Sequence, residues 1–156
     1  MDSNDKVGMV NQQYATAVHV MTALGYYDAF FKKDDTLLSS EDLAKSVDTN
    51  PVVIRRVLGS LAKAKLVKTT RGKAGGVCLA KPPNQITLED IYNGVEVTEK
   101  IAPHNKSPFK ECPVSCEIHN IMSVVCHGVH SATLKYLRSK KLSDLIKTVH
   151  KTQKNK

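Results

Sequence analysis

Residues 39–80 read SSEDLAKSVDTNPVVIRRVLGSLAKAKLVKTTRGKAGGVCLA, and this stretch decides the fold. It opens with serines followed by acids, which is typical of a helix N-terminus, so we expect a short helix over 40–47. A proline then opens a second predicted helix, over 51–64, with Thr49 or Asn50 as its cap. Two helices joined by so short a turn are typical of a helix-turn-helix unit.

The residues after this helix pair predict a β-hairpin. Segments 65–70 and 77–80 have the composition of short strands, and RGKAGG, residues 71–76, is the turn between them. Glycines let the backbone approach a phosphate-lined groove and adopt positive φ, while Arg71 and Lys73 supply charge. The hairpin is therefore interpreted as the wing of a winged helix-turn-helix domain, with an ordinary turn bearing solvated bases as the alternative.

Apolar periodicity predicts two further helices on either side of this unit. The segment 10–31 carries a stripe typical of a core helix: Val10, Tyr14, Ala17, Val18, Met21 and Leu24. The helix over 51–64 and the residues after it have an inward stripe of Val53, Ile54, Val57, Leu58, Leu61 and Leu66. A long helix from Pro113 carries a seam of Val114, Ile118, Ile121, Val125, Val129, Ala132 and Tyr136. Such a seam needs cover, which favours a homodimer over packing on the first helix.

The expected fold is mainly α with a small β-hairpin, in the α+β class. We expect a winged helix-turn-helix DNA-binding domain over 1–98 and a connector loop over 99–112. A dimerisation helix and a C-terminal helix follow over 113–149. The lysine-rich end of the chain, 150–156, is predicted to be a disordered basic tail.

Positive charge is concentrated in one quarter of the chain. The formal net charge is +8, and residues 49–88 hold eight bases and no acid, so the remaining 15 bases are balanced by all 15 acids. A surface that binds a polyanion requires such clustering, although a solvated basic face would look the same.

The run from SSEDLAKSV to ITLEDIYNGVE resembles the Rrf2 family of bacterial winged helix-turn-helix transcription regulators. The resemblance rests on LAKAKLV at the end of the third helix, the RGKAGG wing and ITLEDIYNGVE at the start of the next helix. It covers 10–97 well and extends more loosely to 149, with Val77 standing where the family often has an aromatic residue. The resemblance implies a homodimer that binds a palindromic operator in double-stranded DNA, usually as a repressor.

The predicted DNA contacts come from three segments. Asn can read adenine and Arg guanine in the major groove, whereas hydroxyls and wing bases reach phosphates or the minor groove. The candidates are Thr49, Asn50, Val52, Arg55 and Arg56 on the third helix, Ser39 and Ser40 before the second, and Arg71, Lys73 and Gly75 in the wing. A winged-helix module that binds an acidic partner protein, without specific DNA binding, is the alternative function.

The resemblance also implies, for some members, a two-iron cluster held by three cysteines. In those members the cysteines are spaced by about five residues. Cys112, Cys116 and Cys126 lie in the matching region here, but three and nine residues separate them. On a continuous helix the last two would be about 15 Å apart, so we predict no cofactor unless the helix breaks near Glu117 or a partner chain supplies ligands. Cys126 and His130 could share one helical face as metal ligands, but two candidates do not make a site.

Cys112 precedes a proline and should therefore lie at a helix N-terminus, which favours a thiolate. A redox sensor that uses Cys112 and Cys116 is one hypothesis, and small buried or capping cysteines are the other. No effector can be named.

Other classes of protein find little support in the sequence. It contains no G-x-x-x-x-G-K-[ST] loop, G-x-S-x-G elbow or H-E-x-x-H helix, so we do not expect an enzyme. Apolar runs are too short for a membrane span and the start is not typical of a secretory signal, so a cytoplasmic location is expected.

Overall fold

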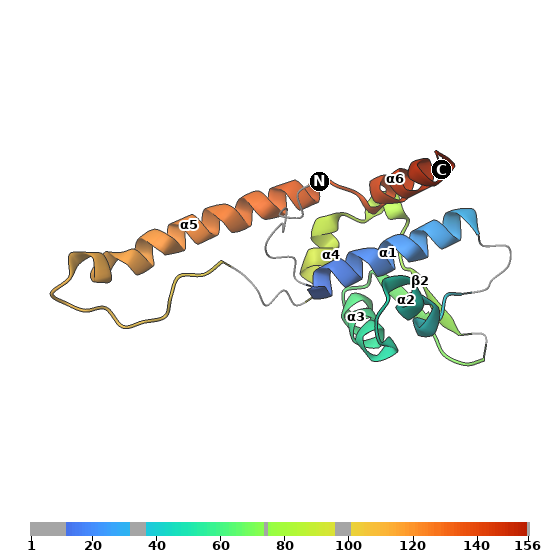
Figure 1. Cartoon of the computed structure of the whole chain (residues 1–156), viewed down its shortest axis with the longest axis horizontal. Coiled ribbons are helices and arrows are strands. Elements are labelled where there is room, and N and C mark those ends of the chain that lie inside the picture. The colour runs from blue at the N-terminus through green and yellow to red at the C-terminus, as the bar shows by residue number, and fades with distance from the viewer. Residues whose placement is uncertain (1–11, 32–36, 74, 96–100, 156) are drawn as a thin grey trace.

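The computed structural model describes residues 12–31, 37–73, 75–95 and 101–155. Its elements are α1 (Gln12–Phe30), α2 (Ser40–Val47), α3 (Pro51–Lys63), β1 (Val67–Thr70), β2 (Gly76–Leu79), the single-turn helix η1 (Pro83–Gln85), α4 (Leu88–Gly94), α5 (Pro113–Arg138) and α6 (Leu142–Lys154). In Figure 1, α2, α3 and the hairpin lie on one side of α1, α6 lies on the other, and α5 extends away from the rest. The predicted class, mainly α with a small β-hairpin, is confirmed.

The core is built around α1, whose Val20 and Met21 side chains are fully buried. α2, α3, the two strands, α4 and α6 also contribute to this core, with residues such as Leu43, Ile54 and Ile91. The predicted stripe of α1 is confirmed for its described members, which are the buried Ala17, Met21 and Leu24 and the half-buried Tyr14 and Val18. Val10 lies outside the described residues.

Short-range capping fixes the helix-turn-helix boundaries. The Ser39 hydroxyl accepts from the Asp42 N–H at 3.1 Å, and the Asp42 carboxylate accepts from the Ser39 N–H at 3.2 Å, which is a capping box. Asn50 caps α3, where a proline fills the first position. The predicted inward stripe of α3 is wrong at Val53, which is 37% exposed because it lies in the first turn, beyond the edge of the buried face.

The hairpin begins two residues later than predicted, at Val67. Lys65 has a left-handed backbone (φ 59°), and the Leu66 N–H donates to the Leu61 carbonyl at 2.9 Å, so these residues close α3 and do not start a strand. The strands pair antiparallel from Val67↔Leu79 to Thr70↔Gly76.

The C-terminal helix differs most from expectation. The predicted disordered tail over 150–156 is instead helical to Lys154, because Leu142 and Ile146 bury an apolar face among the lysines. This face packs on α1, where a side chain at Gly25 would collide with Ile146. The helix therefore belongs to the core of the winged domain, although the sequence grouped it with α5.

α5 is tied to the core at its C-terminal end and carries an uncovered seam. The Arg138 guanidinium donates to both carboxylate oxygens of Glu89 on α4, at 2.6 and 2.7 Å. Along the helix the seam residues Val114, Ile121, Val125, Val129 and Tyr136 are each more than 40% exposed. The described part of the connector, 101–112, has no regular structure. None of the described helices is long and apolar enough to cross a membrane.

The ion pair between Glu89 and Arg138 predicts a pH dependence of folding stability. Hydrogen bonds from Arg138 hold the pKa of Glu89 below its usual 4.5, so the pair stabilises the fold above pH 4.5. That contribution is lost as the pH falls through the lowered pKa. Urea unfolding should therefore show Glu89→Gln less stable than the parent near neutral pH, with the difference shrinking below pH 4.5.

The matched control is Glu117→Gln, which alters an exposed acid on α5. Its stability curve should run parallel to that of the parent. A deficit in Glu89→Gln that did not change with pH would contradict the assigned ion pair.

Candidate nucleic-acid interface

The turn between α2 and α3 is held by backbone hydrogen bonds. Asp48 takes a left-handed conformation (φ 58°), and the Thr49 N–H donates to the Ala44 carbonyl at 3.0 Å. The Asn50 side-chain oxygen then accepts from the Val52 N–H at 2.8 Å and starts α3. α3 thus begins immediately after a fixed turn, as a recognition helix must.

One face of α3 packs on the core and the other is open. Ile54, Val57, Leu58 and Leu61 are buried, whereas Val52, Arg55 and Arg56 are exposed. Thr49 is half-buried in the turn. The structure therefore brings Val52, Arg55 and Arg56 to one outward surface.

Three predicted contacts are already occupied locally. Reading adenine with Asn50 needs its side-chain oxygen, but that oxygen caps α3. The Ser39 hydroxyl donates to Asp42 at 2.6 Å and the Ser40 hydroxyl donates to Glu41 at 3.1 Å. Base reading by Asn50 would therefore cost the helix its cap, so the predicted DNA contact competes with the capping role that the sequence also predicts.

Arg55 is held by an acid that the sequence interpretation missed. Its guanidinium donates to Glu41 on α2 at 2.6 Å, with both side chains more than half exposed. The pKa of Glu41 is lowered, first by a backbone hydrogen bond and then by those from Arg55 and Ser40. A DNA phosphate would compete with this carboxylate for Arg55. The sequence signal for this ion pair is an acid in the first turn of α2, because only a short connection separates α2 from the helix that carries Arg55 and Arg56.

The wing is a tight turn that requires glycine at two positions. Gly72 has φ +113°, and the Gly75 N–H donates to its carbonyl at 2.9 Å. A side chain at Gly75 would collide with the Thr70 carbonyl oxygen. Arg71 and Lys73 are exposed beside this turn, so Gly75 shapes the wing that presents them.

A further bond fixes the wing to the helix-turn-helix. The Val77 N–H in β2 donates at 2.9 Å to the carbonyl of Leu38, the residue before the α2 cap. In Figure 1, α3 and the wing lie on the same side of α1. The bases of 49–88 are all exposed: Arg55, Arg56, Lys63, Lys65, Lys68, Arg71, Lys73 and Lys81. These exposed bases can neutralise a phosphate backbone.

The cysteines do not converge on one site. Cys112 caps α5, as predicted, and its sulfur accepts from the Ser115 N–H at 3.4 Å. The Cys116 thiol donates to the Phe109 and Lys110 carbonyls at 3.7 and 3.8 Å. Cys126 is buried, His130 is exposed, and α5 is continuous through Glu117. Cys78 in β2 is half-buried.

A helix-turn-helix followed by a glycine-bearing hairpin defines the class of winged helix-turn-helix proteins. The model of the Rrf2 family, described as an iron-dependent transcriptional regulator, matches residues 10–148. The chain belongs to this family.

Known proteins similar to this chain agree with that assignment. YwnA of Bacillus subtilis (strain 168), provisionally named an HTH-type transcriptional regulator, is 33% identical over 138 residues, covering 88% of this chain and 97% of YwnA. The HTH-type transcriptional regulator NsrR of Oceanobacillus iheyensis is 29% identical over 140 residues, covering 86% and 85%. The structure of T. potens IscR superposes with a TM-score of 0.69 at 23% identity, covering 94% and 93%, and supports the fold.

The iron implied by the family description does not fit the cysteines of a single chain. Cys116 and Cys126 are ten residues apart on one continuous helix, a rise of about 15 Å. Within the described ranges, no three His, Cys, Asp or Glu side chains are close enough to hold a metal ion. A break near Glu117, which would have brought the cysteines together, is not observed.

The ion pair between Glu41 and Arg55 predicts that removing the acid strengthens DNA binding. Glu41→Gln releases Arg55 and removes a carboxylate that repels phosphate, so we expect affinity to rise about threefold to tenfold at ~0.1 M salt. Fluorescence anisotropy on a labelled duplex measures this change. Glu117→Gln removes the same charge from α5 and should leave affinity unchanged. Weaker binding by Glu41→Gln would show that the pair positions Arg55 for DNA.

Proposed function

We propose that this protein is a homodimeric, sequence-specific repressor of transcription that binds a palindromic operator in double-stranded DNA. The observation that carries the proposal is the open face of α3 beside an exposed basic wing, with the bases of residues 49–88 all accessible. The names of the related regulators support it. The protein acts in the cytoplasm and performs no catalysis.

Each subunit engages two grooves in this proposal. Val52, Arg55 and Arg56 enter the major groove, where arginine can pair with guanine and valine can contact a thymine methyl group. Arg71 and Lys73 enter the neighbouring minor groove. Ser39, Ser40 and Thr49 lie where α2 and the turn would meet phosphates.

The α5 seam supplies the dimer contact. Apolar side chains recur along one face of this helix at spacings of three and four residues and are exposed in the single chain. Pairing two copies would bury both seams and create a two-fold axis. The two recognition helices would then address half-sites about one helical turn, roughly 34 Å, apart.

A thiol response is a second part of the proposal, supported by the position of Cys112. Its sulfur caps the N-terminus of α5, and Cys116 lies one turn further along the helix. Oxidation there would alter the start of the dimer helix.

Operator binding is tested by anisotropy on the duplex immediately upstream of the gene that encodes this protein, against a shuffled duplex, across a salt series. We expect the native duplex to bind about a thousandfold more tightly, with affinity falling steeply as salt rises. Lys73→Ala should weaken both duplexes and reduce the salt slope by about one, whereas Arg56→Ala should mainly reduce the preference. Equal binding of both duplexes would favour the protein-interaction module.

Dimerisation is tested by sedimentation velocity. Val125→Glu places a charge in the seam and should raise the dimer dissociation constant at least about a hundredfold. Asn120→Glu adds the same charge on the opposite face of α5 and should leave the dimer intact. A dimer unaffected by Val125→Glu would exclude the seam as the interface.

A further inference from the structure

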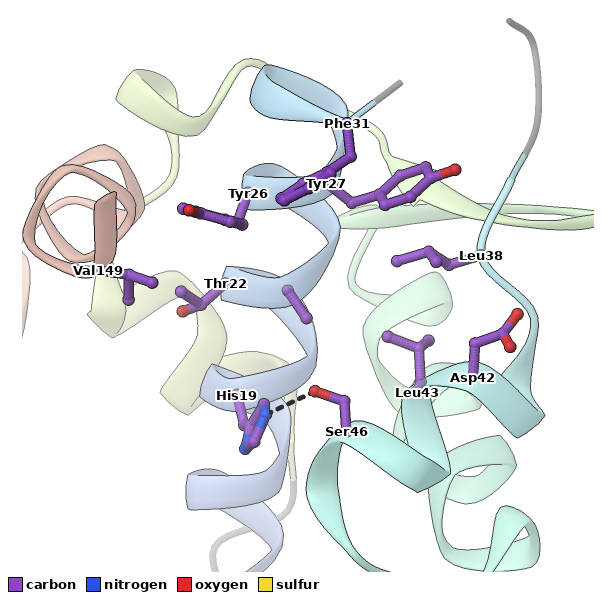
Figure 2. A pocket seen from close by; sticks show the side chains of 11 residues that line it. His19, Thr22, Tyr26, Tyr27, Phe31, Leu38, Asp42, Leu43, Ser46 and Val149 are labelled. Carbon is purple, nitrogen blue, oxygen red and sulfur yellow. Dashed lines mark hydrogen bonds between the residues drawn. The ribbon is translucent and has the colours of Figure 1, made fainter. Parts of the chain in front are cut away.

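A cavity of about 550 Å³ lies between α1 and α2, away from the exposed face of α3. Figure 2 shows side chains from α1 facing others from α2 across it, with Leu38 and Val149 at its edges. Its volume is in the range of small-molecule sites. Neither the DNA interface nor the α5 seam uses it.

One wall of the cavity is aromatic. Tyr27 and Phe31 are stacked, with ring centroids 6.4 Å apart and planes at 16°, and Tyr26 lies 5.8 Å from Phe31. Phe31 is 58% exposed although it borders an apolar cavity. Ala23, Leu38, Leu43 and Val149 add further apolar surface. An apolar molecule that bears aromatic rings would cover this wall.

The described residues that line the cavity carry a negative charge. Among the described lining residues, Asp42 is an acid and none is a lysine or arginine. Hydrogen bonds from the Ser39 side chain and backbone hold the pKa of Asp42 below its usual range, so the carboxylate is ionised at neutral pH. Lys45 makes a smaller contribution to that shift and does not line the cavity. A cavity lined by both aromatic rings and a carboxylate has the two kinds of group that recognise organic cations.

We propose that this cavity binds a lipophilic organic cation bearing aromatic rings, and that this ligand is the effector of the regulator. The cationic centre lies near Asp42, and the rings pack on Tyr26, Tyr27 and Phe31. The effector role rests on the proposed function, whereas ligand binding does not.

The surroundings of the cavity connect it to the DNA-binding elements. His19 Nε2 and the Ser46 hydroxyl share a hydrogen bond of 3.0 Å that joins α1 to α2 (Figure 2). Asp42 belongs to the capping box of α2, and the Leu38 carbonyl accepts from Val77 of the wing. A ligand in the cavity therefore contacts the residues that set α2 and the wing relative to α1. Occupancy shifts these elements and lowers DNA affinity.

The first experiment measures binding to the full-length protein without DNA, by titration calorimetry. Tetraphenylphosphonium and tetraphenylborate have nearly the same size and shape but opposite charge. The net charge of +8 favours the anion at non-specific sites, so a preference for the cation has to come from a specific site. We expect saturable one-site binding of the cation. No cation binding, or equal binding of the anion, would overturn the proposal.

Variants locate the site. Asp42→Asn keeps an oxygen acceptor for Ser39 but removes the negative charge. Phe31→Leu removes one ring of the aromatic wall. Each variant should weaken cation binding at least about threefold. Phe30→Leu is the matched control, because Phe30 stacks on His150 at 3.9 Å and does not line the cavity. Equal losses in Phe30→Leu and Phe31→Leu would overturn the assigned site.

The second experiment adds saturating tetraphenylphosphonium to the operator titration. We expect operator affinity to fall about tenfold, with DNA weakening cation binding by the same factor. Cation binding without a change in operator affinity would overturn the effector role. Absent cation binding with operator preference intact would overturn only this inference, whereas absent operator preference would overturn the proposed function.

Discussion

Burial of the inner face of α1 is the constraint on which the rest of the structure depends. Val20 and Met21 are fully buried there, and the helix-turn-helix, the hairpin, α4 and α6 all contribute side chains to the same core. α6 packs closely on α1 at Gly25, where a side chain would meet the end of the Ile146 side chain. The exposed surface of α3 is therefore free to present Val52, Arg55 and Arg56, since the stability of the helix comes from the opposite face.

Signals that act over a few residues could be predicted from the sequence, and those that depend on distant partners could not. The serine and acids before α2 and the proline of α3 place both helices correctly, because capping is local. The lysines near the end of the chain predict disorder, whereas the structure has a helix there, because Leu142 and Ile146 are buried in a core shared with α1.

Contacts between distant residues also limit the prediction of the candidate nucleic-acid interface. Arg55 and Arg56 were identified by type, but Glu41 acts on Arg55 from another helix, and the capping role of Asn50 competes with base reading.

α5 differs from the rest of the molecule because the described chain does not cover it. Its seam is exposed, and its firm attachment to the winged domain is at the C-terminal end, through Arg138 and Glu89. The family description speaks of iron, yet the cysteines here lie at a helix cap, on an exposed turn and in a buried position along one continuous helix. If this regulator senses a signal at α5, the sensing reaction has to use cysteines that are distributed along the length of that helix.

The bond between Leu38 and Val77 has a consequence for the kind of DNA sequence that such a protein tolerates. Leu38 and Ser39 are neighbours, and one is tied to the wing while the other caps α2. This backbone hydrogen bond links the wing directly to the start of the helix pair, which restricts the separation between the parts that are proposed to meet two adjacent grooves. In the proposed complex, base pairs between those parts would therefore be selected by their twist and groove width, even where no side chain touches them.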